Sequence, residues 1–488
     1  MRTVVAGRGG PLSEEILINV TPQETRVAVV ENGVLQEVHI ERASHRGLVG
    51  NIYKGRVSRF LPGMQAAFVD IGLERAAFLQ TAEMKAGVGG AQASLVEGQD
   101  IVVQVLKDPI GTKGARLTTQ VSLPARYVVY MPMSDHIGIS QKIDNEEERE
   151  RLRVAVRQAM GDEPGGFILR TMAEQVSEDE LKRDIQYLRR LWGRLSERIA
   201  APGLQGLVHE DLSLVLRAMR DLVRDNVEKV RIDSREMFGR AQDFALEFVP
   251  EVAPRVECYT GERPIFDLYS VEDEIKRALD RRVALKSGGY LVIDQTEAMT
   301  TVDVNTGTYV GHRTLAETIF KTNLEAAHAI ARQLRLRNLG GMIIVDFIDM
   351  ADPDHKRQVL RALERALARD RTKASIADMS ALGLVEITRK RTRESLERLL
   401  CETCPACKGR GVLKTPETVT YEIFREILRE ARQFGTDEYL VVASQVVVDR
   451  LLDDQAQSLA RLQEFIGKPI HLQVEPLYNQ EEYEVVLT

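Results

Sequence analysis

Residues 289–305 read GYLVIDQTEAMTTVDVN, and residues 340–350 read GGMIIVDFIDM. Both stretches contain short runs rich in Val, Ile and Thr that end in polar residues, which is typical of β-strands. Between them, residues 315–336 (LAETIFKTNLEAAHAIARQLRL) repeat apolar side chains at helical spacing, and a second helical pattern follows. This alternation predicts an α/β fold with a mixed or parallel sheet over residues 285–400.

Acidic and amide side chains end these predicted strands. Asp303 and Asn305 lie two residues apart, so a strand directs both to one face, and Asp346 closes an apolar run with Asp349 just after it. Sites in open α/β sheets form beyond the carboxyl ends of strands. Two carboxylates that converge there suit Mg²⁺, which takes one or two carboxylates plus water and phosphate oxygens. The alternative is that each aspartate only caps a turn or helix.

A cysteine-rich turn occupies residues 401–411, which read CETCPACKGRG. Cys-Pro-x-Cys followed by glycines presents two thiolates to a tetrahedral Zn²⁺, which needs four ligands. Because no histidine is near, Cys404 and Cys407 from two chains would complete the set, which indicates zinc shared across a homodimer. In that case Cys401 is a bystander, and distant Cys258 is expected to be a small buried apolar side chain. The alternative is a pair of reduced thiols in a tight turn.

Basic side chains cluster near the candidate magnesium site. They are Arg332, Arg335, Arg337, Arg389, Lys390, Arg391, Arg393 and Arg398. On a chain with 66 basic and 73 acidic residues, such a local cluster predicts a polyanionic substrate. The alternative is a solvated helix face that nearby glutamates neutralise.

The N-terminal third is rich in predicted strands. Apolar and polar residues alternate on both sides of Asn32-Gly33, a hairpin signal, and residues 50–120 continue as short strands punctuated by glycine. Evenly spaced short strands predict a small closed barrel. Its aromatic residues are interleaved with cations, as in barrels that stack single-stranded bases, although about half of the rings should belong to the core. The set is Tyr53, Phe60, Phe68 and Phe78 with Lys54, Arg56, Arg59 and Lys113.

Helices are predicted in the middle of the chain. Ser177 and Glu180 form a capping box before an apolar stripe over residues 177–199, and a second helix is predicted over about 210–245. The last 75 or so residues read helix, strand, helix, strand, which predicts a small α/β domain.

Composition excludes several classes of protein. With 488 residues, a net charge of −7 and 44% hydrophobic residues, the chain is neither a basic coat nor a disordered protein. Four cysteines predict a reducing compartment, and the absence of a long apolar run or signal peptide predicts a cytoplasmic protein without a membrane span. Walker A and GxGxxG sequences are missing, so neither an ATPase nor a dinucleotide enzyme is indicated.

Seven motifs together resemble the bacterial ribonuclease E/ribonuclease G family, in order along the chain. They are NIYKGRV, QAAFVDIG, KGARLTT, TTVDVNTG, RQLRLRNLGG, DFIDM and CPACKGRG, and the resemblance covers nearly everything from about Ile16 onward. The long C-terminal tail of ribonuclease E is absent, so the likeness is greater to the ribonuclease G branch.

The resemblance implies a Mg²⁺-dependent endoribonuclease that cuts single-stranded RNA and prefers a 5′ monophosphate. Asp303 and Asp346 match the family's Mg²⁺ ligands, and Asn305 matches the residue that orients Asp303. Cys404 and Cys407 match the zinc link between two protomers, which could pair further into a dimer of dimers. Substrates would be ribosomal RNA precursors, through 5′ maturation, and messenger RNAs, through decay.

RNA-binding roles are also implied by the resemblance. Phe68, Phe78 and Lys113 match RNA contacts of an S1-like OB-fold, and Lys373 is expected to bind RNA from the catalytic domain. Lys373 stands where ribonuclease E has arginine. Lysine cannot make the two parallel hydrogen bonds to a phosphate that an arginine guanidinium makes.

A sensor for the 5′ phosphate is the remaining implied site. Arg170 and Thr171 match its pocket, with Val129 beside them, and Ala125 replaces a glycine that lines it in ribonuclease E.

The resemblance implies a multidomain α/β and β architecture. Its parts are an RNase H-like domain (1–45 and 216–284), an S1-like OB-fold (46–122), a 5′ sensor (123–215), a DNase I-like catalytic domain (285–400), the zinc link (401–412) and a small α/β domain (413–488). Two other functions compete with the endoribonuclease. One is a non-catalytic, zinc-stapled RNA-binding assembly factor, and the other is a DNA-directed phosphodiesterase.

Overall fold

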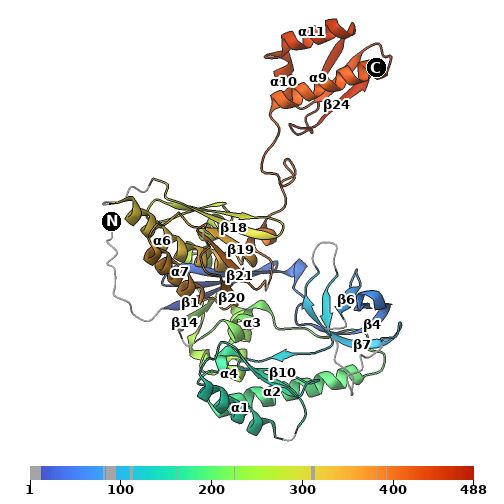
Figure 1. Ribbon diagram of the computed structural model, residues 1–488. Helices are drawn as coiled ribbons and strands as arrows, with labels where there is room; N and C mark the ends of the chain where they lie inside the picture. The colour runs from blue at the N-terminus through green and yellow to red at the C-terminus, as the bar shows by residue number, and fades with distance from the viewer. Residues whose placement is uncertain are drawn as a thin grey trace. The chain divides into compact units, whose positions relative to one another are not determined.

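The computed structural model describes residues 13–80, 83, 95–109, 114–161, 163–224, 226–308, 314–380, 382–391 and 393–488. The chain divides into two compact units, Met1–Leu396 and Glu397–Thr488. The described strands form four sheets in the first unit and one in the second (Figure 1).

The first sheet joins the N-terminus to a segment two hundred residues away. Its order is β15-β14-β1-β2-β3, with helices α3 (Leu214–Asp221) and α4 (Arg235–Phe248) packed in its core. The strands are β1 (Glu14–Val20), β2 (Glu24–Glu31), β3 (Val34–Arg42), β14 (Val227–Ile232) and β15 (Val256–Cys258). The predicted hairpin is confirmed, because Asn32 (φ 49°) and Gly33 (φ 77°) have the positive φ of a type I′ turn.

The helix predicted over about 210–245 is wrong in its middle. Strand β14 separates α3 from α4 and pairs in parallel with β1. Val230 and Ile232 are fully buried and alternate with charged residues, so this short stretch satisfies a period of two. Its partner strand lies far away in the sequence, where a local pattern gives no sign of it.

The predicted small closed barrel is confirmed. Strands β4-β5-β6-β8-β7 run in that order, β7 pairs back to β4 and so closes the ring, and β13 adds to β4 from outside. The strands are β4 (Ile52–Leu61), β5 (Ala66–Asp70), β6 (Ala77–Gln80), β7 (Asp100–Lys107), β8 (Arg116–Thr118) and β13 (Gly206–His209).

A third sheet carries two helices. Its strands, in the order β11-β12-β10-β9, share a core with α1 (Glu146–Met160) and α2 (Glu178–Ala200). They are β9 (Leu123–Pro124), β10 (Val128–Met131), β11 (Ile137–Ile139) and β12 (Gly166–Leu169). The capping box of Ser177 and Glu180 is confirmed at the start of α2.

The fourth sheet is mixed, as predicted, with the order β16-β17-β18-β19-β21-β20 and one parallel pair, β18–β19, among its described pairings. Helices α6 (Leu315–Leu336) and α7 (Pro353–Leu367) pack together on one face (Figure 1). The strands are β16 (Arg282–Ala284), β17 (Tyr290–Gln295), β18 (Met299–Asn305), β19 (Gly341–Asp346), β20 (Ala374–Ile376) and β21 (Leu384–Arg389). Short helix α5 (Val271–Arg277) precedes the sheet.

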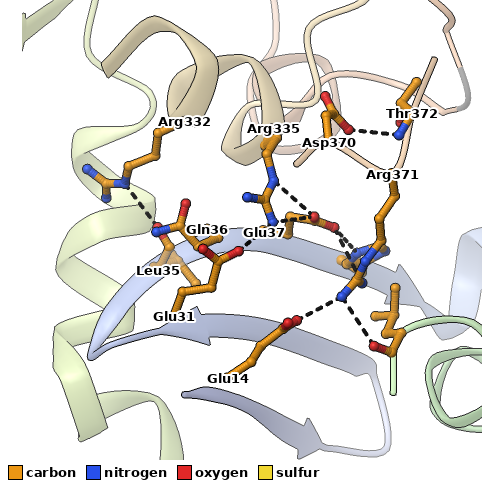
Figure 2. Close-up of polar contacts among 12 residues, drawn as sticks. Glu14, Glu31, Leu35, Gln36, Glu37, Arg332, Arg335, Asp370, Arg371 and Thr372 are labelled. Atoms are coloured by element: carbon orange, nitrogen blue, oxygen red, sulfur yellow. Dashed lines mark hydrogen bonds and ion pairs between the residues drawn. The ribbon is translucent and has the colours of Figure 1, made fainter. Parts of the chain in front are cut away.

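Ion pairs join helix α6 and the segment between α7 and β20 to the first sheet. Arg335 donates to Glu31 and Glu37 at 2.9 Å, and Arg371 donates to Glu14 at 2.7 Å (Figure 2). Although burial alone would raise it, the pKa of Glu37 is held well below its usual value by the His39 hydrogen bond and by the charges of Arg371 and Arg335. These contacts fix the two sheets together.

The second unit begins near helix α8 (Leu396–Leu400) and ends in a three-stranded sheet with the order β23-β22-β24. The predicted order of helix, strand, helix and strand is found as α9 (Pro416–Gln433), β22 (Tyr439–Ala443), a helical region and β24 (Tyr483–Leu487). The helical region consists of two helices, α10 (Gln445–Leu452) and α11 (Ala456–Ile466), and strand β23 (Ile470–Val474) was not predicted. Among the described residues, no helix is both long and apolar enough to span a membrane.

Candidate active site and RNA-binding surfaces

The structure brings the two predicted metal ligands together. Asp303, two residues before the end of β18, and Asp346, the last residue of the parallel strand β19, are partners in register, so their side chains share one face of the sheet. Neighbouring strands lie about 4.8 Å apart. The Nδ2 amide of Asn305 donates to Oδ2 of Asp303 at 2.8 Å, which orients that carboxylate. Both aspartates are exposed.

The electrostatics of this face favour a bound cation. Burial raises the pKa of Asp346, and the neighbouring carboxylates of Asp303 and Asp349 raise it further. Helices α6 and α7 cover the opposite face, so the carboxylates lie on the face that these helices leave uncovered. Two adjacent oxygen donors of like charge, open to solvent, fit Mg²⁺, which keeps several water ligands. The described residues hold no group of three or more His, Cys, Asp or Glu able to bind a metal.

The predicted arginine cluster is not one basic surface, and that prediction is corrected. Arg335 is buried against Glu31 and Glu37, and Arg389 is buried with its Nε 2.7 Å from Asp370. Arg332 donates to the Leu35 carbonyl at 3.0 Å (Figure 2). These side chains connect elements that are far apart in sequence, while Lys390 and Arg391 stay exposed.

The predicted sensor residues lie at one end of strands β10 and β12. Val129 on β10 pairs with Ile168 on β12, and Arg170 is the first residue after β12. The Arg170 guanidinium donates to the Ala125 carbonyl at 2.6 Å and pairs with Asp221 at 2.7 Å. Arg170 is therefore held in one orientation by a backbone carbonyl and a carboxylate.

A chain of contacts links the sensor to the edge of the fourth sheet. The hydroxyl of Thr171 bonds that of Ser140 at 2.9 Å, and the next residue, Gln141, accepts from Lys373 Nζ at 3.0 Å. Lys142 then donates to the carbonyl of Arg371 at 3.0 Å. Lys373 thus lies near the predicted sensor.

The barrel presents a row of aromatic and basic side chains. Phe68 and Phe78 are half-buried cross-strand partners, with ring centroids 5.9 Å apart in an edge-to-face arrangement. Arg59 pairs with Phe68, while Arg116 pairs with Phe78 and with Lys107, so these five side chains share one row. Rings flanked by cations are typical of surfaces that bind single strands.

The remaining barrel residues divide as expected. Tyr53 is buried in the barrel core and Phe60 packs against it, so half of the four rings are core residues. Lys113 lies outside the described residues. Strand pairing adds Arg116 and Lys107 to this surface. They could not be predicted from the sequence, because their alignment with the two rings depends on pairing between strands that are far apart in the chain.

The cysteine turn presents two thiols. The N–H of Lys408 donates to the Cys404 carbonyl at 2.8 Å, and Lys408 and Gly409 adopt positive φ. The backbone N–H groups of Gly411 and Gly409 lower the pKa of the Cys407 thiol, as a metal-binding thiolate requires. This donor set fits half of a tetrahedral zinc site. Cys258 is only half-buried, which corrects the prediction of a buried side chain.

Two carboxylates on an open sheet face, in a unit that also carries a barrel with outward rings, are typical of proteins that bind and cut polynucleotides. The sequence matches the Ribonuclease E/G family over residues 122–392, and the RNase E/G, Thioredoxin-like domain over residues 403–487. The chain belongs to the ribonuclease E/G family.

Relatives within the family cover almost the whole chain. Ribonuclease G of Escherichia coli (strain K12) is 55% identical over 489 residues, which span 98% of this chain and 100% of that protein. Ribonuclease G of Haemophilus influenzae is 52% identical, over 97% of this chain and 99% of that protein. Ribonuclease E of Escherichia coli (strain K12) is 36% identical over 91% of this chain but 43% of its own length.

Proposed function

We propose that this chain is a Mg²⁺-dependent endoribonuclease that hydrolyses single-stranded RNA and prefers RNA with a 5′ monophosphate. Its membership of the family, with identities of 52–55% to ribonucleases G, makes it an endoribonuclease. The observation that carries the metal-dependent mechanism is the register pairing of Asp303 with Asp346 on an exposed face.

Asp303 and Asp346 would hold the Mg²⁺, and Asn305 would keep the Asp303 carboxylate in place through its 2.8 Å hydrogen bond. Bound there, Mg²⁺ supplies charge neutralisation at the phosphate and lowers the pKa of a water. The water would lose a proton as its oxygen bonds to phosphorus, the bond from phosphorus to O3′ would break, and O3′ would take up a proton. The products carry a 5′ phosphate and a 3′ hydroxyl.

The barrel and the sensor would position the RNA. Phe68 and Phe78 would stack bases, with Lys113 as a further contact, while Arg170 and Thr171 would bind the 5′ phosphate beside Val129. Lys373, bonded to Gln141 at 3.0 Å, would contact RNA from the sensor side of the fourth sheet.

A shared Zn²⁺, held by Cys404 and Cys407 of two protomers, would make a homodimer that could pair into a dimer of dimers. We assign the sheets, in chain order, to an RNase H-like domain with an inserted OB-fold and sensor, a DNase I-like domain and a small domain. The reducing cytoplasm suits these free thiols. Maturation of ribosomal RNA 5′ ends and messenger RNA decay are the proposed roles.

The test is to map the products on one defined short RNA in Mg²⁺, with a 5′ monophosphate in one sample and a 5′ hydroxyl in another. We expect one cut with a 5′ phosphate on the downstream product, faster with the monophosphate. Binding without cleavage would favour a non-catalytic RNA-binding assembly factor. Equal cutting of a strand with deoxyribose at the cut site would favour a DNA-directed phosphodiesterase.

A further inference from the structure

Arg282 shares a row of the fourth sheet with both metal-binding candidates. Arg282 on β16 pairs with Val292 on β17, Val292 pairs with Asp303, and Asp303 pairs with Asp346. Partners in register direct their side chains to the same face of a sheet. Arg282 is therefore on the carboxylate face, two strands or about 10 Å from Asp303.

The guanidinium of Arg282 is held in place by an aromatic ring. Its Cζ lies 3.7 Å from the ring centroid of Tyr290, a cation–π contact. Tyr290 is the register partner of Asn305, which itself orients Asp303. The ring therefore holds the cation toward the Asn305 end of the site and leaves the edges of the guanidinium, with their N–H groups, open to solvent.

Arg282 also keeps its charge unneutralised. Within the described part of the chain, no carboxylate pairs with it, although the neighbouring Arg281 donates to Asp294 Oδ2 at 2.7 Å. The same face carries several carboxylates, which repel a polyanion. A strand of RNA that lies across it needs a fixed cation near the cut.

We propose that Arg282, clamped on Tyr290, binds the RNA phosphate next to the one that is cleaved and so sets the register of the strand across Asp303 and Asp346. The inference rests on the proposed function of those two carboxylates. The Tyr290 ring covers one flat face of the guanidinium, and the N–H groups along its edge remain open. Such a guanidinium suits two parallel hydrogen bonds to a phosphate better than stacking on a base.

The first test compares Arg282→Gln with Arg281→Gln, a change of equal charge at the adjacent residue, on a short 5′-monophosphorylated RNA. We expect Arg282→Gln to raise KM roughly tenfold, with a smaller change in kcat. The slope of log KM against log salt concentration should fall by about 1, because one phosphate contact is lost. Arg281→Gln should stay within about twofold of the wild type, since Asp294 already neutralises that charge. Arg282→Lys should restore part of the loss, and Tyr290→Phe, which keeps the ring, should cost less than Tyr290→Leu.

The second test places one neutral methylphosphonate at each position around the cut site. In the wild type, one position beside the cut should raise KM by a factor close to that of Arg282→Gln, and in Arg282→Gln that position should no longer matter. An unchanged KM for Arg282→Gln, or the same penalty at that position in both enzymes, would overturn the inference. If Asp303→Asn also cleaves normally, the proposed function fails instead, so the two failures are distinguishable.

Discussion

The role of an arginine in this structure depends on the groups that its side chain contacts. Arg170 and Arg335 are both arginines that accompany predicted functional sites. Arg335 is buried between two glutamates, whereas Arg170 is half-buried and, among the residues that the structure describes, pairs with one carboxylate, Asp221, and a backbone carbonyl. Removing one partner of a buried ion pair leaves an uncompensated charge in the protein interior and destabilises the fold. The role of Arg335 is therefore to stabilise the fold. Arg170 still has free N–H groups for a ligand.

Replacement of Arg170 by glutamine should remove the preference for a 5′ monophosphate. The pocket would lose its cation, so the ratio of cleavage rates for 5′-monophosphorylated and 5′-hydroxyl RNA should fall to about one. The rate on 5′-hydroxyl RNA should change less than about twofold. Arg190→Gln, at an exposed position on α2, is the matched control and should keep the preference. A preference that survives in Arg170→Gln would contradict the sensor assignment.

A buried carboxyl beside the predicted sensor should make stability depend on pH. Asp184 accepts the Tyr127 N–H at 2.7 Å, and burial raises its pKa from 3.8 to about 6. Because the folded pKa is the higher one, the stability that Asp184 contributes is full below about pH 4 and is lost as the pH rises through 6.

Asp184→Asn removes this titration while it keeps an acceptor for Tyr127. Between pH 5 and pH 7, the wild type should therefore lose about 1.3 kcal/mol of stability relative to the variant, which is part of a full effect of about 3 kcal/mol between about pH 3 and pH 7. Thermal unfolding at several pH values measures the difference. Parallel curves for the two proteins would show that Asp184 does not titrate in this range.

At the scale of elements, register decides which side chains act together. Strand pairing puts Phe68 and Phe78 in one row, flanked by Arg59 and Arg116, although they come from four strands. The same rule aligns Asp303 of β18 with Asp346 of β19.

Phe68→Ala should weaken binding of a single-stranded RNA by about 1–3 kcal/mol, because one base loses its stacking surface. The measurement is fluorescence anisotropy in an Asp303→Asn background, where the RNA should stay intact. Tyr53→Phe, a conservative change of a ring in the barrel core, is the control and should bind like its parent. Equal affinities for Phe68→Ala and the control would mean that RNA does not use this face.

Local patterns predicted most elements but not the distant pairings. The capping box of α2 and the Asn32-Gly33 hairpin are set by neighbouring residues, the barrel is indicated by its evenly spaced short strands, and all three are confirmed. Strand β14 was missed because six residues gain their strand conformation from β1, far away in the sequence. The pairing of Asp303 with Asp346 follows from strand ends, whereas Arg170 with Asp221 and Lys373 with Gln141 leave no trace in the sequence.

In the whole molecule, metal ions would have two separate tasks: Mg²⁺ would support cleavage, and Zn²⁺ would join two chains. Asp303 and Asp346 offer two carboxylates in the first unit, and Cys404 and Cys407 offer two of the three thiols in the second, so neither pair alone completes a coordination shell. Water and RNA phosphate oxygens would complete the first, and a second chain would complete the other.

Replacement of both Cys404 and Cys407 by serine should convert a dimer into monomers, because hydroxyls do not replace thiolates on zinc. Light scattering measures the mass, and zinc content should fall in parallel. Cys401→Ser is the matched control, since Cys401 is expected to be a bystander, and should remain dimeric. An unchanged mass for the double variant would mean that the turn does not join two chains.

Cleavage depends, in the proposed mechanism, on an ion that Asp303 and Asp346 hold together. The most direct measurement is single-turnover cleavage of a 5′-monophosphorylated RNA by Asp303→Asn across a Mg²⁺ titration, with RNA binding measured on the same sample. Asp294→Asn, an acid on β17 that pairs with Arg281, is the control and should cleave normally. We predict that Asp303→Asn binds RNA like the wild type and cleaves at least about a thousandfold more slowly. Wild-type cleavage by Asp303→Asn in saturating Mg²⁺ would contradict the account.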